Sequence, residues 1–93
     1  MNKRRDGTMR DDYIDQMVKN LPVLRAAVDL TQAQLGEKLG VSRQTIVAIE
    51  NEKSPLTWSL YLAIVCVFGQ YENSRRLLEK LALFSKEFIV DDL

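Results

Sequence analysis

Apolar residues recur along this chain at intervals of three and four rather than two, which is the spacing of one helix face and not of a strand. Only four glycines and two prolines interrupt this pattern. The sequence therefore predicts an all-α protein. Its 93 residues fit a single domain, and 46% hydrophobic against 28% charged residues is typical of a soluble globular protein.

Capping residues predict where the middle helices begin and end. Thr31 and Gln34 have the spacing of a capping box, and Gly40 can adopt the left-handed conformation that ends a helix. Ser42 and Thr57 are expected to cap two later helices. The predicted helices in this part of the chain span about 31–39, 43–51 and 58–68.

The two ends of the chain are less sharply defined. A helical stretch is expected over about 11–19, and Pro22 then leaves two alternatives open, a second helix beginning there or one kinked helix. The last helix is predicted to begin at Asn73 or Ser74, with apolar residues along one side as far as Phe88.

Charge is distributed unevenly although the formal net charge is zero. Residues 1–10 carry four basic side chains against Asp6 alone, and the next eight residues carry three aspartates and no basic residue. We expect residues 1–10 to form a flexible basic arm and residues 11–93 to form one domain. Total charge does not support nucleic-acid binding, so any such case depends on where charges lie.

Residue types exclude several functions. The chain has no histidine and a single cysteine, Cys66, so it lacks histidine-based catalysis, a Cys/His zinc site and an intrachain disulfide. No nucleophile with a base and no phosphate-binding glycine loop is visible, so we expect neither an enzyme nor a cofactor. Cys66 is interpreted as a buried small hydrophobe. The single cysteine fits a cytoplasmic protein. The longest apolar run, residues 60–68, is far shorter than the ~20 residues of a membrane span.

The most informative stretch is residues 31–51, TQAQLGEKLGVSRQTIVAIEN. Two short helices joined by Gly-Val-Ser must cross steeply and share one small wedge of core. The stretch resembles the helix-turn-helix of the Cro and phage-repressor (XRE-type) family. The resemblance implies a compact five-helix, lambda-repressor-like domain, here with an extra N-terminal helical stretch. The wedge is predicted to contain Ala33, Leu35, Leu39, Val41, Ile46 and Ile49.

In this family the helix over residues 43–51 would enter the DNA major groove, which is ~12 Å wide. Arg43 suits guanine and Gln44 suits adenine, because each can form a two-pronged hydrogen bond with the base edge. Val47 and Ala48 share their face and could contact thymine methyl groups.

Other residues are expected to anchor the protein to the DNA backbone. The resemblance assigns Gln32, the glutamine after the helix-opening threonine, to a phosphate contact. Whether the basic arm also contacts DNA stays open. The remaining backbone candidates are Thr31, Ser42, Thr45, Asn51 and Lys53.

The resemblance also implies a structural pair, Arg25 with Glu50, between the first helix and the helix over residues 43–51. Two positions depart from the family pattern. Gly36 replaces the usual alanine, which costs helix stability. Glu52 stands where glycine often follows Glu-Asn, so the turn there is expected to be strained or differently shaped, and its negative charge near phosphates is unfavourable.

These features predict a transcriptional regulator of prokaryotic or phage type, a repressor that binds operator DNA as a homodimer. Residues 70–93, the last helix and tail, are the predicted dimerisation element. An antitoxin that binds DNA and masks a protein toxin shares the same motif and remains the alternative.

Overall fold

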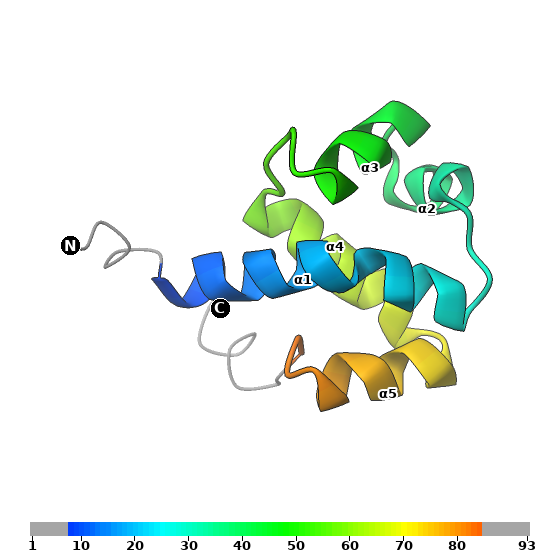
Figure 1. The fold of residues 1–93 in the computed structure, drawn as a ribbon. Coiled ribbons are helices and arrows are strands. Elements are labelled where there is room, and N and C mark those ends of the chain that lie inside the picture. The colour runs from blue at the N-terminus through cyan, green and yellow to red at the C-terminus, as the bar shows by residue number, and fades with distance from the viewer. Residues whose placement is uncertain (1–7, 85–93) are drawn as a thin grey trace.

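The computed structural model describes residues 8–84 and consists there entirely of helices and connecting turns (Figure 1). This confirms the predicted all-α class. None of the described helices is long and apolar enough to cross a membrane. The helices are α1 (Thr8–Ala27), α2 (Gln32–Leu39), α3 (Arg43–Glu50), α4 (Trp58–Gly69) and α5 (Glu72–Lys80).

The predicted stretch over residues 11–19 and the segment around Pro22 form one continuous helix, α1, with Pro22 inside it. Met17, Leu21 and Leu24 are fully buried, and their spacing of four and three forms a single stripe that both halves share. Pro22 faces solvent. The helix begins at Thr8, so residues 8–10 are helical and not part of a flexible arm, while residues 1–7 lie outside the described part.

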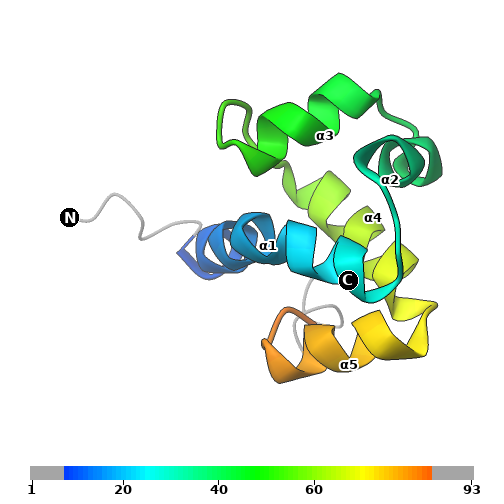
Figure 2. The same cartoon turned by 45° about the vertical axis from the view of Figure 1, so that its right-hand side comes forward.

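The helix-turn-helix pair α2–α3 lies on one side of α1 and α4, and α5 lies on the other (Figures 1 and 2). Helix α1 packs against α3, α4 and α5, and α4 packs against α1, α2 and α5. Both sides therefore share one core. Its fully or nearly fully buried apolar residues are Met17, Leu21, Leu24, Leu35, Ile46, Ile49, Leu56, Tyr61, Ile64, Val65, Phe68, Leu78 and Leu83.

Aromatic residues connect α1 to α4 and to the end of the described chain. The rings of Trp58 and Tyr61 stack with centroids 4.7 Å apart, and the Tyr13 ring lies 6.2 Å from that of Tyr61. The buried Tyr61 hydroxyl donates a hydrogen bond to the Leu83 carbonyl. Burial, with Tyr13 beside it, raises the pKa of the Tyr61 hydroxyl far above its ordinary value.

Two residues predicted to be buried are exposed. Cys66 is exposed and lies on the same side of α4 as the exposed Ser59, seven residues or about two turns earlier. Larger apolar residues fill the inner side of the helix. Ala33 is exposed on α2, so it does not fill the wedge beneath the helix-turn-helix.

Helix α5 differs from its prediction at both ends. It begins at Glu72, and Ser74 is not a cap but is buried, with its hydroxyl donating to the Phe68 carbonyl at 2.6 Å. It ends at Lys80 because Ala82 adopts a left-handed conformation, φ 58°, which turns Leu83 into the core. Phe88 lies outside the described residues.

Candidate nucleic-acid interface

Helix α2 begins with a complete capping box. The Thr31 hydroxyl oxygen accepts from the Gln34 backbone N–H at 3.0 Å, and the Gln34 side-chain oxygen accepts from the Thr31 N–H at 2.9 Å. This confirms the predicted cap. The Thr31 N–H is thereby already paired within the protein.

The turn between α2 and α3 follows the predicted geometry. Gly40 is left-handed with φ 78°, and the Val41 N–H donates to the Gly36 carbonyl at 2.9 Å. Ser42 then caps α3, its hydroxyl oxygen accepting from the Thr45 N–H at 3.1 Å. A second bond joins the Ser42 and Thr45 hydroxyls at 3.0 Å. The N-terminal end of α3 is therefore fixed by its own cap.

Helix α3 has one buried side and one polar end. Ile46 and Ile49 are buried in the core, as expected. Arg43 and Gln44 are exposed on the first turn, whereas Val47 and Ala48 are half-buried on the second. The structure thus leaves the two polar base-reading candidates open to a ligand, and the two apolar ones partly covered.

The backbone-contact candidates fall into two groups. Asn51, Lys53 and Ser42 are exposed around α3. Gln32 is half-buried, and its amide nitrogen Nε2 donates to Glu50 Oε1 at 2.9 Å. This contact was not expected from the sequence, since it joins residues 18 positions apart on different helices.

The structure brings Arg25 and Glu50 together in a two-point salt bridge between α1 and α3. Arg25 Nε donates to Glu50 Oε2 at 2.8 Å, and Arg25 Nη2 donates to Oε1 at 3.0 Å. The side chains are only 18% and 6% exposed. Arg25 Nη1 also donates to the Leu30 carbonyl at 3.2 Å. These bonds join α1, the segment before α2 and the end of α3.

Glu52 occupies a strained position directly after α3, as its departure from the family pattern predicts. Its φ is 60°, the left-handed region that favours glycine. The Lys53 N–H donates to the Ala48 carbonyl at 2.8 Å and the Glu52 N–H to the Ile49 carbonyl at 3.0 Å. This is a Schellman motif, in which glycine is the usual residue at the position of Glu52.

We expect Glu52→Gly to raise the free energy of unfolding by about 0.5 to 1 kcal/mol, because the strain exceeds the added entropy of the unfolded chain. Denaturation by urea would measure the change. Glu52→Ala is the matched control, since it removes the charge but keeps the Cβ atom. An equal gain in both variants would assign the effect to charge and contradict the backbone explanation.

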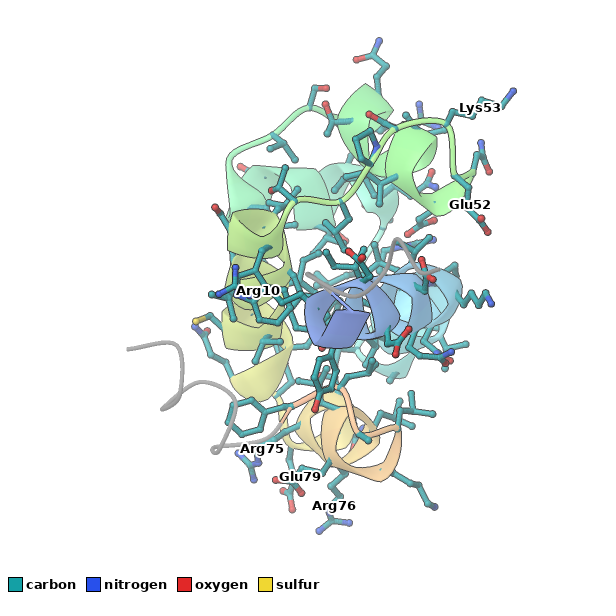
Figure 3. The ribbon with its side chains drawn as sticks, turned by 90° about the vertical axis from the view of Figure 1, so that its left-hand side faces the viewer. Arg10, Glu52, Lys53, Arg75, Arg76 and Glu79 are labelled. Carbon is teal, nitrogen blue, oxygen red and sulfur yellow. The ribbon has the colours of Figure 1, made fainter. Side chains whose placement is uncertain are left out.

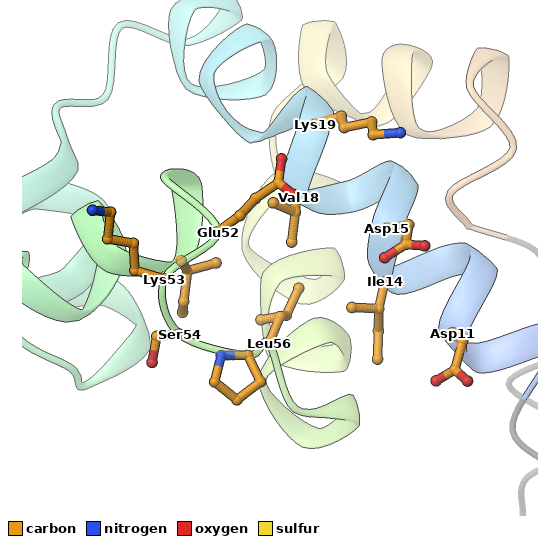
Figure 4. A pocket seen from close by; sticks show the side chains of 11 residues that line it. Asp11, Ile14, Asp15, Val18, Lys19, Glu52, Lys53, Ser54 and Leu56 are labelled. Carbon is orange, nitrogen blue, oxygen red and sulfur yellow. The ribbon is translucent and has the colours of Figure 1, made fainter. Parts of the chain in front are cut away.

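A surface cavity of about 560 Å³ lies between α1 and the segment that follows α3 (Figure 4). Apolar residues such as Ile14 and Leu56 line it, together with the carboxylates of Asp11, Asp15 and Glu52. Glu52 points toward α1 and Lys53 points away from it. Within residues 8–84 no group of three His, Cys, Asp or Glu is placed to hold a metal ion.

Comparison with known proteins identifies this arrangement. A helix-turn-helix family model matches residues 24–72, which include α2, α3 and α4. The chain belongs to the XRE-type helix-turn-helix family. It is 47% identical over 53 residues to an uncharacterized HTH-type transcriptional regulator of Methanocaldococcus jannaschii, covering 57% of this chain and 80% of that protein. No solved structure matches the chain.

Membership of the XRE-type family gives the geometry a chemical meaning. The family match covers α2 and α3, which form the helix-turn-helix pair. The first turn of α3 carries the exposed Arg43 and Gln44.

Proposed function

We propose that this chain is a sequence-specific transcriptional repressor that inserts the first turn of α3 into the major groove of its operator. The observation that carries the proposal is the two-sided character of α3. Ile46 and Ile49 fix the inner side in the core, while Arg43 and Gln44 extend from its capped, exposed end. A groove ~12 Å wide admits such a helix end-on.

Base reading would depend on Arg43 for guanine and Gln44 for adenine, with Val47 and Ala48 providing close apolar contact. Backbone anchoring would use the exposed and half-buried polar groups around them. These are Thr31, Gln32, Ser42, Thr45, Asn51 and Lys53. Occupation of the operator would then exclude polymerase.

Replacing Arg43 or Gln44 by alanine should weaken binding to a selected operator by about 10-fold each, because a bidentate base contact is lost. The operator is first obtained by selecting duplexes that bind the purified protein. Fluorescence anisotropy with operator and random duplexes measures the change.

Arg75→Ala is the matched control, since Arg75 is also exposed but lies on α5, on the far side of the molecule from Lys53 (Figure 3). It should leave affinity unchanged. If the Arg43 and Gln44 variants keep their full preference for operator over random DNA, these residues do not read bases.

We further propose that the repressor acts as a two-fold dimer, because paired half-sites about 34 Å apart give such domains adequate specificity. In α5, Leu78 is buried, and the outward Arg75, Arg76 and Glu79 are charged (Figure 3). Among residues 10–84, whose exposure the structure describes, the one exposed large apolar residue is Val23. The dimer contact is proposed for residues 70–93, of which residues 85–93 lie outside the described part of the chain.

Light scattering should give a dimer for the full chain at micromolar concentration and a monomer for a chain that ends at Lys86. A dimer that survives truncation would move the interface to another surface. A full-length monomer that co-purifies with a second protein would support the antitoxin alternative instead.

A further inference from the structure

The carboxylate of Glu50 accepts hydrogen bonds from two different helices. Arg25 on α1 donates to both of its oxygens, and Gln32 on α2 donates to Oε1. We propose that Glu50 is a positioning residue for DNA binding, which holds the Gln32 side-chain amide ready to donate to a DNA phosphate. This inference rests on the proposed function and assigns Glu50 a role in affinity beyond its role in stability.

The charge of Glu50 decides which way the Gln32 amide faces. A side-chain amide presents an NH₂ group on one side and a carbonyl oxygen on the other. If the carbonyl oxygen of Gln32 faced Glu50, two acceptors would oppose each other without a proton between them. The observed bond, Nε2 to Oε1 at 2.9 Å, places the donor group there.

The NH₂ group of Gln32 has two N–H bonds, and Glu50 uses one of them. Gln32 is half-buried at the first position of α2, so its side chain is accessible to a ligand at that helix end. A phosphate oxygen is an acceptor and suits the second N–H. A phosphate at this position also gains from the N-terminal dipole of α2.

Glu50 itself cannot easily turn away from Gln32. Its side chain is 6% exposed and is held by Arg25 at 2.8 and 3.0 Å. Arg25 is held in turn by the Leu30 carbonyl. The Gln32 side chain is therefore ordered before DNA binds, which removes an entropic cost from the binding step.

The experiment compares Glu50→Gln, Gln32→Ala and the double variant. Glu50→Gln keeps the shape of the side chain but removes the charge that orients the amide. We expect each single variant to lose about 10-fold in affinity for operator and random duplexes alike, since a phosphate contact does not read sequence. The double variant should lose no more than Gln32→Ala alone.

Affinity is measured by anisotropy at a temperature where circular dichroism shows every variant folded. The exposed Glu79 on α5 provides the control, since Glu79→Gln should change nothing. If the role of Glu50 is purely structural, Glu50→Gln will lower the melting temperature without changing Kd, or the affinity losses of the two single variants will add in the double variant. Either result overturns the proposal and leaves the proposed function standing, whereas failure of the wild-type protein to select any duplex overturns the proposed function.

A second measurement needs no variant of Glu50. The NMR signals of the Gln32 side-chain NH₂ group are assigned by their loss in Gln32→Ala. In the wild-type protein they should shift when operator duplex is added, because the free N–H gains a phosphate partner. Signals that stay at the same position when DNA is bound would overturn the proposal.

Discussion

Replacing Glu50 by alanine should lower the free energy of unfolding by about 3 kcal/mol, because it leaves the Arg25 guanidinium in a mostly buried site without its anion. The wild-type pair has two short bonds, and its side chains are 18% and 6% exposed. Breaking such a pair from one side costs more than the pair itself contributes, since the remaining charge is still desolvated. Urea denaturation monitored by circular dichroism would measure the loss.

The double variant Arg25→Met with Glu50→Ala should recover part of that stability, because no charge is then stranded. The chain contains a matched exposed pair, Glu72 with Arg76, joined at 2.7 Å but 62% and 73% exposed. Glu72→Ala should cost less than about 0.5 kcal/mol, since water screens that pair. A thermodynamic cycle without coupling between Arg25 and Glu50 would contradict the assignment.

Local features of the fold could be predicted from the sequence because their partners lie within a few residues. The capping box of Thr31 and Gln34 joins positions three apart, and the Ser42 cap does the same at α3. The left-handed Gly40 needs only its own lack of a side chain. Such features depend little on the rest of the molecule, so the boundaries of α2 and α3 were predicted well.

Features that depend on tertiary packing were predicted less well. The apolar composition of the α4 segment indicated burial of Cys66, but composition does not say which side of a helix faces outward. The continuity of α1 through Pro22 follows from a shared buried stripe, which becomes visible only when both halves meet one core. Ala82 ends α5 in a conformation that alanine rarely adopts, so no sequence signal marked that position.

The candidate site also contains local features that the sequence predicts and tertiary contacts that it does not. The positions of Arg43 and Gln44 on α3 follow from helical periodicity once the cap at Ser42 is placed. The bond from Gln32 to Glu50 depends on the crossing of α2 and α3, which residue spacing does not specify. Helix α2 comes close to the turn at Gly36, the glycine that departs from the family pattern, where a Cβ atom would lie 2.7 Å from the Val41 carbonyl oxygen.

Gly36→Ala should lower the free energy of unfolding by about 2 kcal/mol, although alanine favours helices and is the family's usual residue here. A Cβ atom at this position would lie 2.7 Å from the Val41 carbonyl oxygen and 3.2 Å from that of Ser42. Both are backbone atoms of the turn and cannot rotate away as a side chain could. Overpacking of this kind costs up to about 3 kcal/mol, and the better helix propensity offsets about 1 kcal/mol of it.

The same clash should affect DNA binding, because relieving it moves the turn that carries Ser42 and with it the end of α3 that is proposed to read bases. We expect Gly36→Ala to weaken operator binding measured at a temperature where it is folded. Gly69→Ala is the matched control, since a Cβ atom there meets nothing within 4 Å. It should gain a little stability inside α4 through helix propensity. If Gly36→Ala is as stable as Gly69→Ala, then α2 and the turn separate at little cost, and the crossing of α2 and α3 does not depend on a glycine.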